Sequence, residues 1–311
     1  MSIRNLIFRV VGVALCTTSG WQYCIGQTTS QATPSNWTVE VRDLSPRFLD
    51  FYRTAVADQA SPDRRWELWK ERYDFAAVPP IAAGQAIARR QLDEAWPRYQ
   101  SSLARIEAGA VALRPSPQSR LDEVVALLRP HVSGQIQLTA FVGTFHRSAF
   151  ASGKKEGVWQ IAIPLEDSDQ DHALDMTHEF THAVQRAAGH WEGQTVGGAI
   201  FSEGLAMRVT EKLNPGFAPQ IYTTSTKEWL DACTAKLPEV FHDFDSHLND
   251  SGAEAVSRFT VQKGEAGLDR EVYCAGWFVI ANLLKEGRSL SELGNLPQSE
   301  AIKLVEKQMQ E

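Results

Sequence analysis

The sequence predicts an α+β fold that is mostly helical and contains a small β-sheet. Two segments, Gln135 to Val142 and Val158 to Pro164, alternate apolar and polar residues and are rich in β-branched side chains, as half-buried strands are. We expect these strands to share a sheet, with residues 153–157 forming a turn or flexible loop between them. Elsewhere, apolar residues recur three or four positions apart over long stretches, which indicates amphipathic helices.

The chain is predicted to divide into a helical N-terminal region, residues 45–133, and a larger domain, residues 134–311. Apolar and aromatic residues at helical spacing dominate the first region, and prolines at 79–80 and 115–117 mark boundaries between its helices. The larger domain contains both strands. Its expected helices are Asp171 to Ala188, Gly198 to Leu213, Thr226 to Lys236, Glu271 to Glu286 and Ser299 to Gln310.

The first 26 residues are predicted to be a cleavable export signal. Arg4 and Arg9 give a basic start, Val10 to Cys16 is apolar, and small residues precede a cleavage site before Gln27. A membrane anchor is the alternative, but a spanning helix requires ~18–20 apolar residues and this run is far shorter. Residues 27–44 are predicted to be a linker, because their first part is polar and lacks an apolar period. We therefore expect a periplasmic or secreted protein without stable membrane insertion.

Charge and cysteine content narrow the possible partners. The net charge of −7 and the absence of a long Lys/Arg run argue against nucleic acid as a partner. Signal removal leaves two cysteines, Cys233 and Cys274, and an even number in an exported chain suggests one disulfide. Two unrelated buried thiols are the alternative, because spacing alone does not show that the residues meet.

The chemistry is concentrated in residues 178–182, which read His-Glu-Phe-Thr-His within a helical pattern. Residues four apart on a helix differ by about 40° in direction, so His178 and His182 can bind one metal ion. Ordinary helix histidines are the alternative interpretation. However, both point away from the predicted core stripe, which comprises Met176, Phe180, Ala183, Val184 and Ala187. They are therefore not core-packing residues.

Glu203 is the predicted third ligand. It lies 21 residues after His182, on a helical face that it shares with apolar residues such as Ala199 and Ala206. A buried carboxylate is costly unless it has a partner, and Zn²⁺ is a suitable one. The alternatives are interaction with a helix N-terminus or a salt bridge to an arginine.

This constellation resembles the gluzincin class of zinc peptidases, in which two histidines and a later glutamate bind the metal. The stretch from about residue 135 to 290 is similar to a bacterial family of predicted zinc-dependent proteases, to which Tyr273-Cys274-Ala275-Gly276 adds a weak match. The resemblance implies a zincin-like domain for residues 134–311. Met207 departs from the thermolysin-like pattern, which has an acidic residue four positions after the ligand glutamate. Asp175 is a candidate for orienting His178 instead.

We therefore expect an exported zinc peptidase that acts on peptide or protein substrates. Glu179 would be the general base for a metal-activated water, and Tyr273 the candidate oxyanion donor, with His146 and His190 as further candidates. The strand at Trp159 to Ile163 is expected to pair with an extended peptide as an edge strand. A zinc hydrolase of another amide or ester, and a non-catalytic exported binding protein with a vestigial metal site, remain alternatives.

Overall fold

The computed structural model describes residues 36–78 and 82–310. The predicted signal peptide lies outside these residues, as do most of the residues that precede the first strand. The described chain combines a four-stranded sheet with thirteen α-helices, which confirms the predicted α+β class. No helix among the described residues is long and apolar enough to cross a membrane.

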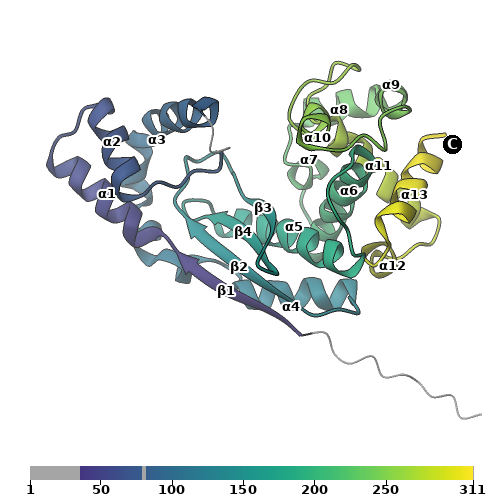
Figure 1. The fold of residues 1–311 in the computed structure, drawn as a ribbon, viewed down its shortest axis with the longest axis horizontal. Coiled ribbons are helices and arrows are strands. Elements are labelled where there is room, and N and C mark those ends of the chain that lie inside the picture. The colour runs from purple at the N-terminus through teal and green to yellow at the C-terminus, as the bar shows by residue number, and fades with distance from the viewer. Residues whose placement is uncertain (1–35, 79–81, 311) are drawn as a thin grey trace, which may run out of the picture. The chain divides into compact units, whose positions relative to one another are not determined.

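The sheet has the strand order β1-β2-β4-β3. Its strands are β1 (Trp37–Asp43), β2 (Gly134–Phe141), β3 (Phe150–Lys155) and β4 (Val158–Pro164). β1 and β4 run parallel to β2, while β3 pairs antiparallel with β4. The prediction that the two recognised strands share a sheet is therefore confirmed (Figure 1).

Three details of the predicted organisation were wrong. β1 forms within residues 27–44, so the linker ends earlier than predicted, because backbone pairing with β2 compensates for the short apolar pattern of this segment. Much of the predicted loop at 153–157 belongs to β3, which turns back at Glu156 and Gly157. β4 is flanked by β2 and β3, so β3 rather than β4 is the edge strand on this side.

The helices account for most of the remaining described residues. Those before β2 are α1 (Ser45–Ala57), α2 (Pro62–Arg72), α3 (Ala82–Ala108) and α4 (Pro117–Leu128), with a 3-10 turn at Gly109–Ala112. Those after β4 are α5 (Asp169–Ala188), α6 (Val196–Leu213), α7 (Pro219–Tyr222), α8 (Lys227–Ala235), α9 (Leu237–Phe244), α10 (Ala253–Thr260), α11 (Glu271–Lys285), α12 (Leu290–Gly294) and α13 (Gln298–Gln310). All five helices predicted in the larger domain are present.

The N-terminal helices hold the loop that follows β2. Phe48 of α1 packs against the rings of Tyr73 and Tyr99, at centroid distances of 5.3 and 4.8 Å. The Tyr73 hydroxyl donates to the carbonyl of Val142 and also accepts from its N–H, and the Tyr99 hydroxyl donates to the carbonyl of Gly143. Buried aromatic rings therefore fix the backbone at the start of this loop.

α5 lies between the sheet and α6 (Figure 1). Ser168 caps its first turn by accepting a hydrogen bond from the N–H of Asp171. Met176, Phe180 and Val184 are fully buried, as the helical periodicity predicted. His178 lies on the opposite side of α5 and therefore faces α6.

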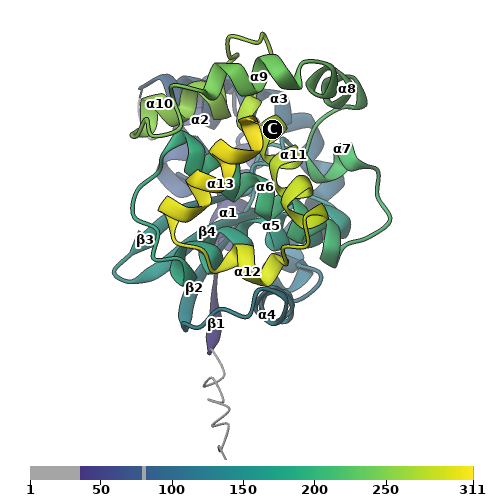
Figure 2. The same ribbon diagram turned by 90° about the vertical axis from the view of Figure 1, so that its right-hand side faces the viewer.

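α6 and α11 cross at a pair of glycines. A side-chain carbon added at Gly204 would lie 2.2 Å from the carbonyl oxygen of Gly276, and one added at Gly276 would lie 2.4 Å from that of Ile200. The helix backbones can approach this closely only without side chains at these positions. A disulfide between Cys233 and Cys274 joins α8 to α11, which confirms the predicted pairing. α13 packs beside α6 and α11 (Figure 2).

Two buried carboxyl groups meet where α9 approaches α11. Glu271 accepts a hydrogen bond from the N–H of Leu268, and Asp243 accepts one from the N–H of Glu265. The other oxygen of each carboxyl has no partner among the described groups, and the two side chains lie close enough for Asp243 to act on the pKa of Glu271. Burial and the neighbouring carboxyl raise the pKa of Glu271 from 4.5 to about 7, so the pair holds a proton near neutral pH.

We predict that Glu271→Gln increases stability in alkaline buffer. The folded state keeps its proton up to about pH 7 whereas the unfolded chain loses it near 4.5, so wild-type stability falls as the pH rises through this window. The full difference corresponds to roughly 3 kcal/mol. In urea unfolding, the free energy of unfolding of the variant should exceed that of wild type above pH 7, and the two should differ little below pH 4.5. Glu239→Gln, an exposed change on α9, is the control, and a gain independent of pH would contradict the shared proton.

Candidate metal centre

α5 and α6 bring His178, His182 and Glu203 together. Nε2 of His178 lies 3.1 Å from Glu203 Oε2, and Nε2 of His182 lies 3.5 Å from Glu203 Oε1. Donor atoms on a tetrahedral zinc ion, each ~2.0–2.1 Å from the metal, are about 3.4 Å apart. All three residues offer donor atoms within 4.8 Å of one another, and they are the only such group found among the described residues. The spacing and chemistry of these donors fit a zinc ion.

The hydrogen bonds of His182 strengthen this fit. The Ser202 hydroxyl donates to Gln185 Oε1, at 2.7 Å, so its oxygen is left to accept from Nδ1–H of His182, at 2.9 Å. This assignment places the proton of a neutral His182 on Nδ1. The Nε2 lone pair then faces the Glu203 carboxylate, and two electron-rich atoms at that separation repel unless a cation lies between them. A metal ion would supply that positive charge.

The electrostatics of the three residues are strongly coupled. Burial raises the pKa of Glu203, but when His182 is protonated on both ring nitrogens, its positive charge and the hydrogen bonds from both imidazoles outweigh burial and hold this pKa well below its usual range. Burial disfavours the His178 cation, yet its hydrogen bond with Glu203 leaves the pKa raised. The Glu203 carboxyl group is therefore ionised near neutral pH and can bind a cation.

Glu179 adjoins these residues without joining the donor group. It is buried, and burial raises the pKa of its carboxyl, although the charges of His178 and His182 oppose the rise. A carboxylate with a raised pKa is a better proton acceptor near neutral pH than a solvated one. Its environment suits the role of general base that the motif predicts.

Two cavities meet at the candidate centre. The first, of about 380 Å³, extends past Asp175 toward Thr210, Thr224 and Arg270. The second, of about 180 Å³, extends along β3 toward Trp159, Arg186 and Gln194. Four residues line both: Ala149, His178, Glu179 and Tyr273. A substrate that occupies both cavities would pass directly over Glu179 and the metal ligands.

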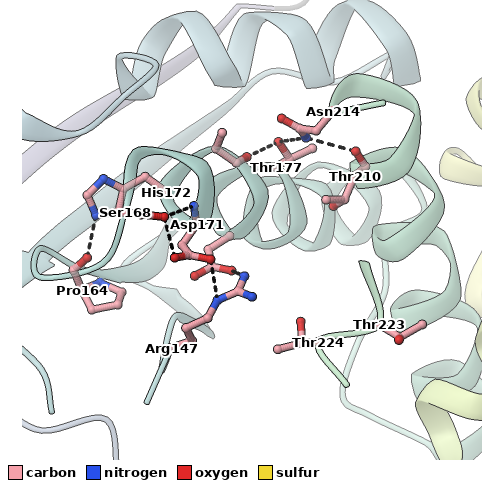
Figure 3. Close-up of polar contacts among 12 residues, drawn as sticks. Arg147, Pro164, Ser168, Asp171, His172, Thr177, Thr210, Asn214, Thr223 and Thr224 are labelled. Carbon is pink, nitrogen blue, oxygen red and sulfur yellow. Dashed lines mark hydrogen bonds and ion pairs between the residues drawn. The ribbon is translucent and has the colours of Figure 1, made fainter. Parts of the chain in front are cut away.

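The loop after β2 forms one wall of the first cavity. Arg147 pairs with Asp175 at 2.7 Å and with Asp171 at 3.2 Å, both on α5. Figure 3 shows Arg147 reaching Asp171, with Thr224 on a separate segment facing it. Asp175 therefore binds Arg147, and no hydrogen bond joins it to His178 in the described structure. The prediction that Asp175 orients His178 is not supported, while Ser202 orients the other histidine.

The three candidate oxyanion donors are placed differently. Tyr273 lines both cavities, and burial together with the charges of Glu203 and Glu179 raises the pKa of its phenol, so the hydroxyl keeps its proton. The guanidinium of Arg270 stacks on its ring, 4.0 Å from the centroid. His146 lines only the first cavity. His190 is exposed beside His131 and lines neither cavity, so it is excluded as a donor.

Ser202, Gln185 and Arg186 were not singled out from the sequence. Ser202 and Gln185 act through contacts across the α5–α6 interface, which no local pattern encodes. Arg186 follows His182 by four residues, and this spacing on the same helix face was a usable signal.

Comparisons with family models, with curated proteins and with solved structures found no match. The geometry of the site therefore carries the functional argument by itself.

We predict that His178→Ala and His182→Ala lose most of the zinc bound by wild type and that Glu203→Ala loses much of it. Each change removes one of three protein donors. Elemental analysis after dialysis against metal-free buffer measures the content. His146→Ala, a histidine in the first cavity outside the donor group, should retain zinc. Wild-type zinc content in all three ligand variants would rule out this centre.

We predict that Ser202→Ala weakens zinc binding by ~10–100-fold, because His182 loses the acceptor that fixes its tautomer. The dissociation constant is measured by competition with a chromophoric chelator. Ser291→Ala removes a comparable hydroxyl that donates to the Leu128 carbonyl on other helices, and it should leave the constant unchanged. Equal affinity in wild type and Ser202→Ala would show that the serine does not support the ligand.

Proposed function

We propose that this chain is a zinc-dependent peptidase with a zincin-like catalytic domain. The observation that carries the proposal is the convergence of His178, His182 and Glu203 at the point where two cavities meet, with the Glu179 carboxyl beside them. A structural zinc site has four protein ligands, whereas a catalytic site has three and keeps one position open. Three donors next to a buried carboxylate fit the catalytic arrangement.

In the proposed mechanism, His178, His182 and Glu203 hold the zinc ion, which would acidify a water molecule and polarise the substrate carbonyl. Glu179 accepts the proton of the attacking water and returns it to the leaving amine. Tyr273, whose phenol stays protonated beside both cavities, donates a hydrogen bond to the oxygen that becomes negative. Each group acts from a helix, which favours a fixed geometry.

The edge strand β3 supports a peptide substrate. Phe150, Ala151 and Gly153 of β3 line the second cavity, and one side of this strand has no neighbour in the sheet. Its free backbone groups can pair with an extended peptide and lay it across Glu179. A small amide or ester would not need this strand, so β3 favours the peptidase over the other hydrolases.

Export is part of the proposal. The disulfide between Cys233 and Cys274 supports it, because such bonds persist in oxidising compartments outside the cytosol. The predicted signal sequence lies outside the described residues. The proposed substrates are therefore peptides or proteins of the periplasm or the surrounding medium.

We predict that Glu179→Gln folds and binds zinc as wild type does but cleaves peptides at least ~100-fold more slowly. Glutamine keeps the size of the side chain and removes its basicity, and general-base contributions typically reach 10²–10⁴. The test combines elemental analysis with digestion of a broad peptide library. Glu254→Gln, a change on α10, is the control. Cleavage by Glu179→Gln at the wild-type rate would refute this mechanism. If wild-type protein binds one zinc ion but cleaves no peptide, the alternative of a non-catalytic exported binding protein is favoured.

A further inference from the structure

Arg186 differs from the other arginines that line the two cavities. Arg147 pairs with two aspartates, and Arg270 donates to the carbonyls of Thr223 and Thr224 while it stacks on Tyr273. The guanidinium of Arg186 makes no hydrogen bond or ion pair with any residue in 36–78 or 82–310, and its Nε atom, like that of Arg147, is buried without an acceptor. A half-buried guanidinium without an anionic partner is costly.

The position of Arg186 suggests which partner is missing. It lies on α5 one turn after His182 and lines the second cavity together with Glu203 and Gln194. Burial lowers the pKa of Arg186, and the charges of Glu203 and Glu179 only partly offset this effect. Those two carboxylates already face the metal position. An additional anion in the cavity would give the guanidinium a partner of its own.

The charges lining the cavity lead to the same inference. With His178 and His182 neutral, as they would be on a metal ion, Glu179 and Glu203 contribute two negative charges and Arg186 one positive charge, so the lining residues sum to −1. With the divalent ion of the proposed function, the sum becomes +1, which a single carboxylate neutralises. The volume, about 180 Å³, suits one short side chain or a chain end. An arginine fork matches the two oxygens of a carboxylate.

We propose that Arg186 binds a carboxylate of the substrate in the second cavity and so determines specificity for acidic substrates. The carboxylate belongs either to an Asp or Glu side chain next to the cleaved bond or to a free C-terminus. This inference rests on the proposed peptidase function, and it concerns recognition rather than the chemical step.

The kinetic test compares matched quenched-fluorescence peptides on the zinc-loaded full-length protein. One pair differs by Asp or Asn near the cleavage site, and the other by a free or amidated C-terminus, which separates the two sources. Wild type should prefer an acid over its amide, and Arg186→Met should lower this preference by ~10–100-fold, as expected for a charge-assisted hydrogen bond. Arg186→Lys should retain part of it. Arg90→Met, an exposed change on α3, should retain all of it.

A binding measurement is independent of turnover. Calorimetry on zinc-loaded Glu179→Gln protein, with and without the Arg186→Met change, compares N-acetylglutamine amide, which has no carboxylate, with an acid that has one: N-acetylglutamate α-amide for the side chain, or N-acetylglutamine for the chain end. The acid should bind more tightly, and Arg186→Met should remove the difference without changing zinc content. An acid preference that survives Arg186→Met would show that the metal alone selects the carboxylate, and it would overturn the proposal.

Two further outcomes distinguish this inference from the proposed function. If Arg186→Met slows acids and amides equally, Arg186 stabilises the transition state of every substrate and specificity is refuted while the peptidase stands. If wild type cleaves no peptide, the peptidase proposal fails. The calorimetric difference then decides the carboxylate inference by itself.

Discussion

A carboxylate held between two imidazoles is the interaction on which the rest of this site depends. Glu203 sits in a mostly buried interface and needs positive charge on the side where His178 and His182 present Nε2. That requirement fixes how α6 lies against α5, because a shift of one turn would bury the carboxylate without a partner. The contact between Gly204 and Gly276 then brings α11 against α6, and with it Tyr273 reaches the same cavities.

Two sets of supports, distant in sequence, hold the walls of the cavities. On one side, the tyrosines of the N-terminal region bind the backbone after β2, and this loop delivers Arg147 to Asp175. On the other, the disulfide to α8 and the contacts of Arg270 with the Thr223 and Thr224 carbonyls hold the start of α11. Residues 45–133 thus have a physical role in the site although none of those that the structure describes lines the two central cavities.

Five buried or half-buried acidic groups among the described residues fall into two kinds. Asp175 pairs with Arg147, and the pKa of Glu271 is raised by its burial and by the neighbouring Asp243. Glu203 and Glu179 instead face cavities open to a ligand. The same distinction applies to the cations, since Arg147 pairs with Asp171 and Asp175 whereas the Arg186 guanidinium pairs with no carboxylate among the described residues. At the second cavity, a guanidinium without a carboxylate partner is therefore placed to receive an anionic ligand.

The sequence by itself determined the helix that carries His178 and His182, the fold class and the five helices of the larger domain, because helical periodicity and residue spacing are local properties of the backbone. The sequence also identified Glu203 and the cysteine pair. An acidic residue on an apolar helix face and an even number of cysteines are both visible without a structure, and each suggests a partner. The tertiary structure alone decided which strand lies at the edge, because β3 has a weak apolar pattern and gains its stability from pairing with β4. It likewise decided that Ser202 hydrogen-bonds His182, that Asp175 pairs with Arg147 rather than His178, and that the Arg186 guanidinium has no partner among the described residues. These contacts depend on how α5, α6 and the loop after β2 approach one another in space.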